Sequence, residues 1–432
     1  MTCRPDLAAS LLEYNRVMGA AQDAVSQFSP ALSSQARSFS RLTRDLDYLN
    51  HGSFGACPDA VLDHQGMLRD RMEREAVKFF VYDLEPLLDE AMSALGGMLD
   101  ADPQDLAPVT NATVGVNSVL RSLEFAPGDE LLTTNHEYNA CCNVLQFVAK
   151  RGGARVVVAD VPFPVRDEAQ VVDAILARVT KRTRLAMISH ITSPTAIVFP
   201  IKRIVHALAA RGIDTLVDAA HAPGMVDVSI RDINPAYYTG NCHKWLCAPK
   251  GAGFLYVRRD LQKQIRPAVI SHGANSKRTD RSRYRIEFFW TGTSDPTPVL
   301  CVPKAIETMA GLLPGGWAAL RDANRALARS GRDCLCAALG VTPPVPDAML
   351  GSMASIPLPA APPGAPPPTS SLYADPLQNR LIDRHRVQVP IVPWPQPPER
   401  LVRISAQVYN SPPQYDRLSQ TLIRALADEA RP

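Results

Sequence analysis

Between about residues 110 and 257, short apolar runs alternate with longer stretches in which apolar residues recur every three or four positions. The short runs predict β-strands and the periodic stretches predict helices. We expect strands at 130–134, 155–161, 184–191, 215–217, 236–238 and 251–257, and helices at 116–123, 140–149, 168–179 and 203–211. Strands that alternate with helices form a mostly parallel sheet with helices on both faces. The pattern therefore predicts an α/β protein with a large domain of this kind.

The flanking parts of the chain show helical periodicity at 59–99 and 302–339. Residues 342–369 are rich in proline, which is incompatible with a helix and predicts an exposed, extended loop. Beyond it we expect a helix, two strands and a last helix, at 377–386, 387–391, 401–406 and 415–426. The expected organisation is a helical arm (1–46), a large domain (47–298) and a smaller α+β domain (299–432) that contains the proline-rich loop.

Composition narrows the function classes. Of the 432 residues, 46% are hydrophobic and 21% are charged, as in ordinary globular enzymes. The net charge of +3 is spread without basic blocks, which argues against nucleic-acid binding. No apolar run approaches the ~18 residues of a membrane helix, and charges interrupt the N-terminal apolar residues, so we expect a cytoplasmic protein. The nine cysteines lack metal-ligand spacing, which indicates free thiols and no metal site.

Four polar clusters directly follow predicted strands, at 135–138, 189–195, 218–221 and 241–244. Ligands of parallel sheets bind beyond the carboxyl ends of the strands. Lys244 lies on a loop between two apolar segments, and Asp218 stands at an earlier strand end. We therefore hypothesise that Lys244 carries pyridoxal phosphate as a Schiff base and that Asp218 keeps the ring nitrogen protonated. A surface ion-pairing lysine and a helix N-cap aspartate are the alternatives.

Pyridoxal phosphate also needs a flat side chain against its ring and a partner for its phenolate oxygen. Tyr138 is the candidate stacking residue, and His136 is the alternative. Ser193 and His221 are the candidates near the phenolate oxygen.

The cofactor phosphate needs a nest of hydrogen-bond donors, and we expect it from Ala112, Thr113, Asn241 and His243. Ala112 and Thr113 precede a predicted helix, whose free N–H groups and dipole favour an anion. An ordinary N-cap is the alternative there. The chain has no glycine-rich dinucleotide fingerprint, P-loop, HExxH or GxSxG motif, which removes the commonest competing sites.

Several of these segments resemble the class V aminotransferase group of fold-type I pyridoxal-phosphate enzymes. They are Asn-His-Gly-Ser-Phe-Gly at 50–55, Ser-Pro-Thr at 193–195, Asp-Ala-Ala-His-Ala-Pro-Gly at 218–224 and Gly-Asn-Cys-His-Lys-Trp-Leu at 240–246. Within the group, the chain is most similar to isopenicillin N epimerase-like proteins and to carbon–sulfur lyases, from about residue 48 to the last predicted helix. The resemblance implies a homodimer with its active site at the subunit boundary.

The resemblance also implies roles for single residues. Thr293, in Trp-Thr-Gly-Thr at 290–293, matches the residue that reaches the cofactor phosphate of the neighbouring subunit. Arg403 matches the arginine that binds the substrate α-carboxylate, a role that suits a planar guanidinium; a surface strand arginine is the alternative. Asn50 and His51 match residues that line the substrate side.

Two departures from the family pattern bear on the reaction. Cysteine desulfurases of this class carry a nucleophilic cysteine on a loop of the small domain, and the corresponding region here, 357–373, contains none. Persulfide chemistry is therefore not expected. The usual serine three places before the lysine is Asn241, as in the epimerase-like branch.

The expected chemistry begins when Lys244 removes the Cα proton of an amino acid whose carboxylate Arg403 binds. Loss of a sulfur group from Cβ gives a carbon–sulfur lyase, and return of a proton on the opposite face gives an epimerase; Tyr138 is the candidate acid in both. Transfer of the proton to the cofactor gives an aminotransferase. We expect a β-lyase acting on an S-substituted cysteine-type substrate, with the epimerase as a close alternative and the aminotransferase third. A non-catalytic relative would lack Lys244 or Asp218.

Overall fold

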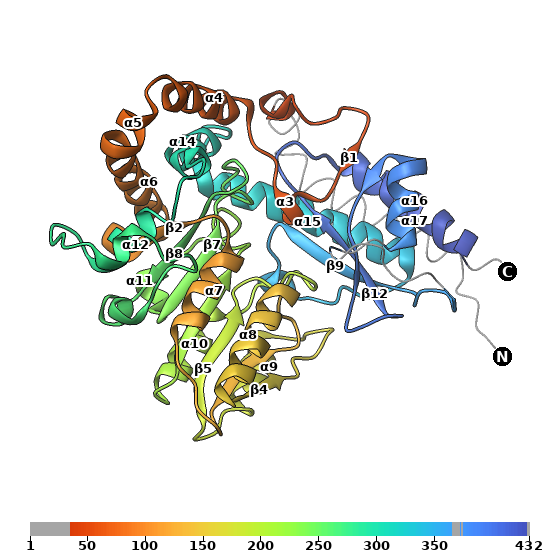
Figure 1. Cartoon of the computed structure of the whole chain (residues 1–432). Helices are drawn as coiled ribbons and strands as arrows, with labels where there is room; N and C mark the ends of the chain where they lie inside the picture. The colour runs from red at the N-terminus through yellow and green to blue at the C-terminus, as the bar shows by residue number, and fades with distance from the viewer. Residues whose placement is uncertain (1–34, 365–371, 373–374, 430–432) are drawn as a thin grey trace.

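The computed structural model describes residues 35–364, 372 and 375–429. Most of the predicted arm, 1–46, lies outside these residues, and the described part of it contains a short 3-10 helix, η1 (Ala36–Phe39). In the described residues, a large domain and a smaller domain lie side by side (Figure 1). No helix in this part of the chain is long and apolar enough to cross a membrane.

The large domain is built on a seven-stranded sheet with the order β2-β8-β7-β6-β5-β3-β4. The strands are β2 (Leu106–Val109), β3 (Glu130–Thr134), β4 (Arg155–Ala159), β5 (Thr183–Ser189), β6 (Asp214–Ala219), β7 (Tyr237–Asn241) and β8 (Gly253–Val257). Strands β4, β3, β5, β6 and β7 are parallel, whereas β8 runs antiparallel to both of its neighbours. The predicted α/β fold with a mostly parallel sheet is confirmed.

Helices cover both faces of this sheet because its strands are apolar on both sides. Successive residues of a strand point to opposite faces. Leu131 therefore packs with side chains of α7 and α8, whereas Leu132 packs with those of α6, α9 and α10. These helices are α6 (Leu84–Leu99), α7 (Ala112–Ser122), α8 (Asn139–Gly152), α9 (Glu168–Leu176) and α10 (Ile201–Ala209).

The small domain contains a three-stranded antiparallel sheet with β12 in the centre, between β11 and β9. Its strands are β9 (Met353–Leu358), β11 (Ile391–Pro393) and β12 (Arg400–Ser405), and its helices are α15 (Gly316–Leu339), α16 (Pro376–His385) and α17 (Pro412–Glu429). The segment that enters the large domain, β1 (Asp47–Tyr48), pairs with β10 (Val387–Gln388). The exact domain limits stay a prediction.

The remaining elements are short or peripheral. They are α3 (His51–Phe54), α4 (Asp59–Arg74), α5 (Ala76–Lys78), α11 (Ile230–Ile233), α12 (Arg283–Phe289), α13 (Thr297–Leu300), α14 (Val302–Ala310), the π-helical turn η2 (Phe79–Asp83) and the 3-10 helices η3 (Pro103–Asp105), η4 (Arg259–Gln264), η5 (His272–Asn275) and η6 (Asp347–Met349).

One prediction along the chain was wrong in part. The proline-rich loop at 342–369 contains a strand, β9, whose only proline, Pro357, lies on an edge strand, where proline is tolerated. The helical predictions at 59–99 and 302–339 are confirmed. The first region contains several helices joined by a π turn, and the second is interrupted near Gly315, which has φ of 93° and lies between α14 and α15.

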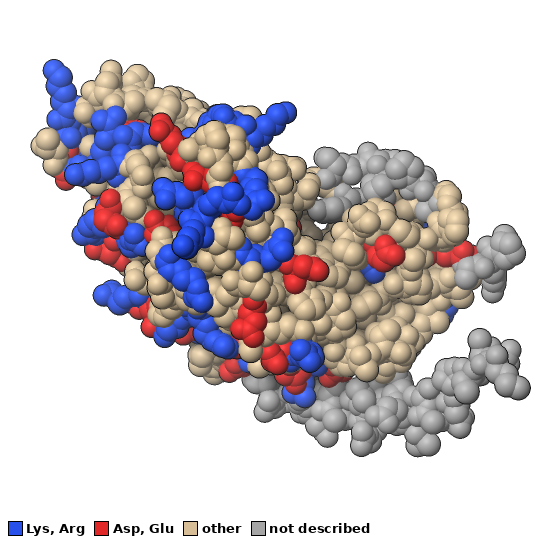
Figure 2. Space-filling view, turned by 90° about the horizontal axis from the view of Figure 1, so that it is seen from below, with Lys and Arg blue, Asp and Glu red and all other residues tan. Residues whose placement is uncertain are grey.

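On the face of the large domain seen in Figure 2, basic side chains are mixed with acidic ones. At the amino-terminal end of the sheet, the buried carboxylate of Glu130 contacts Arg155 at 2.6 Å and Arg182 at 3.1 Å.

Candidate active site

The predicted polar clusters meet at the carboxyl edge of the sheet. Ser189, at the end of β5, is paired in register with Asp218 of β6, and Asp218 is paired with Thr239 of β7. Strand β7 ends at Asn241, so that Lys244 follows within three residues. Residues far apart in the sequence thus lie next to each other because parallel strands end at one edge.

Two glycines allow other backbone segments to pack against the loop that carries Lys244. Gly55 has φ of 72°, and a Cβ there would lie 2.1 Å from the carbonyl oxygen of His243. Gly224 has φ of 87°, and its Cβ would lie 2.5 Å from the carbonyl oxygen of Trp245. The lysine loop is therefore fixed on two sides by close backbone contacts that only glycine permits.

Lys244 and His221 form a contact that favours a neutral amine. The Nζ atom of Lys244 lies 3.1 Å from Nε2 of His221. Because Nδ1 of His221 accepts a hydrogen bond from Nε1 of Trp245 at 3.4 Å, the ring proton is on Nε2 and is donated to the amine. Burial, followed by the charge of Arg403, lowers the pKa of Lys244 to about 7. A neutral amine is the form that acts as nucleophile and base.

Asp218 is only 3% exposed and is oriented by two donors. Its Oδ1 accepts from the Ala220 N–H at 2.9 Å, and its Oδ2 accepts from Sγ of Cys141 at 3.1 Å. The aspartate therefore remains at the buried strand end with a fixed carboxylate plane.

A second buried carboxyl group, Glu137, lies near Asp218 and was not singled out in the sequence. Its Oε1 accepts from Thr134 Oγ1 at 2.9 Å and from the Ser189 N–H at 3.1 Å, and its Oε2 accepts from Ser189 Oγ at 2.5 Å. Burial raises the pKa of Glu137 to about 7, and the charge of Asp218 contributes to this increase. Its position in the cluster at 135–138 was the available signal.

Two residues predicted for the phosphate nest, Ala112 and Asn241, meet at the start of α7. Oδ1 of Asn241 accepts from the Ala112 N–H at 2.8 Å, so this donor already has a partner within the protein. The phosphate nest stays a prediction. Asn111 caps the helix through the Val114 N–H at 2.9 Å, so the N-cap interpretation also holds. Among the described residues, the Thr113 N–H has no hydrogen-bond partner, which leaves it for an anion.

His243 is positioned by its backbone neighbour and is neutral. Its Nδ1 lies 2.9 Å from the carbonyl oxygen of Ala252 and must donate to it. Burial lowers the pKa of His243 to about 4. Donation from Nε2 to a phosphate would require a second ring proton, which a nearby anion stabilises.

Of the two candidate stacking residues, His136 is fully committed to the core. Its Nδ1 lies 2.7 Å from Oγ1 of Thr195 and its Nε2 lies 2.8 Å from the carbonyl oxygen of Val161. Tyr138 is half-buried and immediately precedes α8. Tyr138 as the residue against the cofactor ring, with His136 as the alternative, stays a prediction.

Arg403 lies on the central strand β12 and reaches the large domain. Its Nη1 donates to the carbonyl oxygen of Ser193 at 2.6 Å and to Ser193 Oγ at 3.1 Å, and its Nη2 donates to Ser53 Oγ at 3.0 Å. Ser53 in turn donates to Oδ1 of Asn50 at 2.6 Å. The structure thus places Ser193 in contact with the arginine, and it adds Ser53, which sequence reasoning missed. The predicted role of Ser193 near the phenolate oxygen stays a prediction.

His51 lies next to the backbone of the lysine. It is fully buried, and its Nε2 lies 3.0 Å from the carbonyl oxygen of Lys244. Its expected place on the substrate side stays a prediction.

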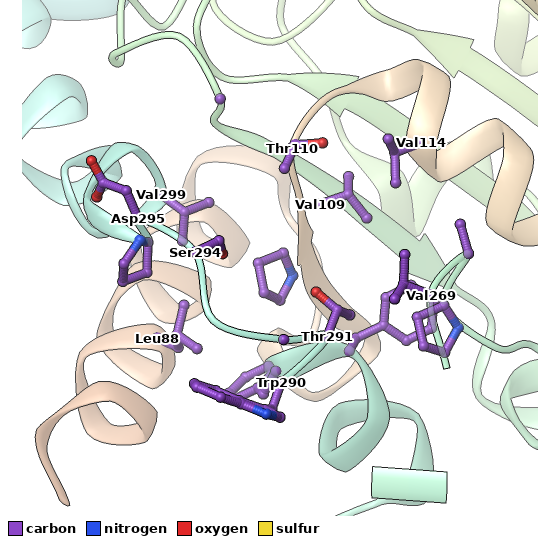
Figure 3. A pocket seen from close by; sticks show the side chains of 18 of the residues that line it. Leu88, Val109, Thr110, Val114, Val269, Trp290, Thr291, Ser294, Asp295 and Val299 are labelled. Carbon is purple, nitrogen blue, oxygen red and sulfur yellow. The ribbon is translucent and has the colours of Figure 1, made fainter. Parts of the chain in front are cut away.

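Thr293 is exposed and adjoins an apolar hollow. Its chain neighbours on either side, Gly292 and Ser294, line this hollow, as does Thr110, which lies just before α7 (Figure 3). Apolar walls are contributed by residues such as Leu88 and Trp290. The segment around Thr293 thus lies at the rim of an apolar hollow.

Comparison with known proteins assigns the family. The family model described as Aminotransferase class-V matches residues 80–335. The chain is 35% identical over 388 residues to an isopenicillin N epimerase from Amycolatopsis lactamdurans, covering 87% of this chain and 94% of that protein. It is 30% identical over 407 residues to a probable chloroplastic L-cysteine desulfhydrase from Arabidopsis thaliana, covering 89% of this chain and 84% of that protein. The chain belongs to the class V aminotransferase family.

Solved structures show the same fold. A cystine C–S lyase in complex with its product cysteine persulfide matches with a TM-score of 0.71 and 21% identity, covering 89% of this chain and 98% of that one. A cysteine desulfurase from Escherichia coli matches with a TM-score of 0.72 and 18% identity, covering 91% and 98%. The class V enzyme therefore has the fold-type I architecture expected from its sequence.

This class V enzyme uses pyridoxal phosphate. The described residues fit that cofactor: a buried carboxylate at Asp218, a neutral amine at Lys244 and an unpaired helix N–H at Thr113. Among the described residues, no group of three or more His, Cys, Asp or Glu side chains could hold a metal ion.

Proposed function

We propose that this class V enzyme is a carbon–sulfur β-lyase that acts on an S-substituted cysteine-type amino acid. The observation that carries the proposal is the neutral Lys244 amine, 3.1 Å from His221, on a cofactor-binding edge that Arg403 also reaches. β-Elimination needs one base on one face of Cα, which Lys244 supplies. Epimerisation needs a second acid–base group on the opposite face.

Each residue has a defined task in this proposal. Arg403 binds the α-carboxylate, and Ser53 and Ser193 orient its guanidinium. Asp218 keeps the proton on the ring nitrogen. The bound cofactor supplies the electron sink for the Cα–H bond electrons. Lys244 accepts the Cα proton, and the Cβ–S bond then breaks with its electron pair leaving on sulfur.

Tyr138 is proposed to complete the reaction as the acid. It stacks on the ring and delivers a proton to the departing sulfur, which leaves as a thiol. The remaining enamine hydrolyses to pyruvate and ammonia.

Amino-acid epimerisation is the second candidate, favoured by the 35% identity to an isopenicillin N epimerase over 94% of that protein. In this case Tyr138 returns a proton to Cα from the face opposite Lys244. Transamination is third, and the absence of cysteine from 357–373 argues against desulfuration through a persulfide.

The experiment that separates these reactions uses S-substituted cysteines, their sulfoxides and ordinary L-amino acids in deuterated water. Release of pyruvate with a thiol supports the lyase. Deuteration at Cα with loss of chirality and without pyruvate shows the epimerase instead. Formation of a 2-oxo acid only in the presence of a second amino acceptor shows an aminotransferase.

We also propose a homodimer in which the hollow beside Thr293 is covered by a second copy. Val269, which lines the hollow, and Ile270 beside it are 58% and 60% exposed, and such apolar exposure marks an interaction surface. Val269→Glu is expected to shift the mass in solution to that of a monomer. The matched control is Val158→Glu, on edge strand β4, which is also exposed (43%) and should leave the mass unchanged.

A further inference from the structure

A chain of hydrogen bonds connects the small domain to the backbone of Lys244. The hydroxyl of Tyr409 lies 2.7 Å from Nδ1 of His51, and Nε2 of His51 lies 3.0 Å from the carbonyl oxygen of Lys244. Three segments that are far apart in the sequence therefore meet behind the lysine.

The direction of each bond in this chain is fixed by its surroundings. The Ala56 N–H also points to Nδ1 of His51, at 3.3 Å, and a backbone N–H can only donate. Nδ1 is thus an acceptor, so Tyr409 donates to it and the ring proton is on Nε2, which donates to Lys244. Burial lowers the pKa of His51 to about 3, so the ring stays neutral and this arrangement persists at ordinary pH.

The turn of the lysine loop is supported from the same side. The Lys244 carbonyl oxygen also accepts from the Cys247 N–H at 3.1 Å, and Cys247 adopts a left-handed conformation with φ of 58°. Nε2 of Gln407 lies 3.7 Å from Sγ of Cys247. Gln407 and Tyr409 both belong to the segment that follows β12, so one small-domain segment supports both ends of this turn.

The segment that bears Tyr409 is also tied to the arginine strand and to the chain around His51. Arg403 and Ser405 lie on β12, directly before it. The Ser405 N–H donates to the Leu49 carbonyl at 2.9 Å, and Ser405 Oγ accepts from the Gly52 N–H at 3.0 Å. Movement of β12 would therefore be transmitted to His51.

We propose that Tyr409 and His51 are positioning residues that hold the Lys244 amine aligned and shielded from water, and that link it to the strand carrying Arg403. The inference rests on the proposed role of Lys244 as the cofactor-binding amine. Neither residue touches the reacting atoms, because His51 contacts only the backbone of Lys244 and Tyr409 contacts His51.

The test compares Tyr409→Phe with Tyr284→Phe. Tyr284 is a matched control, since its buried hydroxyl donates to the Leu255 carbonyl at 2.6 Å, outside the link between β12 and His51. Each full-length variant is freed of cofactor and mixed with pyridoxal phosphate, and the growth of the visible absorbance band is followed across the neutral pH range. Thermal unfolding of each variant is measured in parallel.

For Tyr409→Phe we expect covalent cofactor capture to slow by about three- to tenfold, the size of one lost hydrogen bond. The pH midpoint of capture should rise, because a less shielded amine regains water and its pKa moves up towards its ordinary value. Tyr284→Phe should lose comparable thermal stability and keep the wild-type rate and midpoint.

If the two variants behave alike in cofactor capture, Tyr409 is merely structural and the inference is overturned, while the role of Lys244 stands. A third variant, Lys244→Ala, tests the role of Lys244 separately from the roles of Tyr409 and His51. If this variant still forms the covalent adduct, trapped by borohydride, both the assignment of Lys244 and the inference fail.

Discussion

Two buried glutamates flank strand β3, and their surroundings are opposite in character: Glu130 is its first residue, and Glu137 follows its last residue, Thr134. Glu130, the first residue of β3, is saturated by opposite charge and a hydroxyl: it accepts from Arg155 and from Thr180 at 2.6 Å each, and from Arg182 at 3.1 Å. These partners hold its pKa below the ordinary range, with the hydrogen bond from Thr180 as the largest cause.

Glu137, just beyond the other end of β3, receives hydrogen bonds from Thr134 and Ser189, which are neutral. The nearby charged group is another acid, Asp218. Burial raises the pKa of Glu137 to about 7. The same edge brings two cations together, since the charge of Arg403 contributes to the lowered pKa of Lys244.

This contrast indicates that the amino-terminal edge of the sheet contributes to stability, whereas the carboxyl edge serves chemistry. At the amino-terminal edge, opposite charges are paired, and the pKa of Glu130 moves in the direction that favours its charged form. At the carboxyl edge, groups of like charge type are gathered in a buried space, and the pKa values of Glu137 and Lys244 move in the directions that favour their neutral forms. Perturbation of this kind is typical of functional sites.

The largest expected effect comes from removing the amine at the carboxyl edge. Lys244→Ala should lose the visible absorbance band on dialysis and should lower kcat by about 10²–10⁴-fold, the usual contribution of a general base. Circular dichroism should show an unchanged fold, because the loop is fixed by the backbone of Gly55 and Gly224. If Lys244→Ala kept the absorbance band of the covalently bound cofactor, the carboxyl edge would not be the site of chemistry that the comparison assigns to it.

A smaller effect, on substrate binding, is expected from Arg403→Ala. Loss of a buried guanidinium that binds a carboxylate costs about 2–5 kcal/mol, so kcat/KM should fall roughly 30- to 5000-fold, mainly through KM, for substrates with an α-carboxylate. Steady-state kinetics on the purified holoenzyme measure this.

Arg400 offers the matched control for Arg403. It lies on the same strand and is 3% exposed, but it pairs with Asp375 and Glu429. Arg400→Ala should therefore reduce stability and leave KM unchanged. A wild-type KM in Arg403→Ala would remove Arg403 from the substrate site.

The sequence predicted β3 at its observed limits, 130–134, because an apolar run bounded by polar residues is a strong strand signal. It also placed Lys244 and Asp218 at one edge, since parallel strands must end together. It did not find Glu137, whose significance depends on the fold of β5, where Ser189 meets it. Nor could it place His51 behind Lys244, because that contact joins residues 193 positions apart.

Strand β9 shows why composition misled the prediction for the small domain. Proline content averaged over 342–369 hid a six-residue strand, which is buried against β12. A long-range pairing of this kind leaves no local signal, since register is set by the partner strand.

The smallest effects are expected from neutralising the two glutamates of β3, and they should have opposite pH dependence in cofactor-free protein. Glu130 has a lowered pKa when folded, so its carboxylate contributes stability above the ordinary pKa of 4.5, and this contribution is lost as pH falls through the lowered value. Glu130→Gln should therefore cost about 1–3 kcal/mol at neutral pH, and the difference from wild type should shrink in acid.

For Glu137 the expected pH dependence of stability has the opposite sign. Its pKa rises from 4.5 when unfolded to about 7 when folded, so the wild-type carboxyl group costs increasing stability as pH rises through this interval. Glutamine cannot ionise, so the free energy of unfolding of Glu137→Gln should increase relative to that of wild type as pH rises, by up to roughly 3 kcal/mol. Urea unfolding midpoints at a series of pH values measure both slopes. If the change in unfolding free energy relative to wild type had the same pH dependence in both variants, Glu137 would be as well paired as Glu130. The contrast between the two glutamates would then be lost.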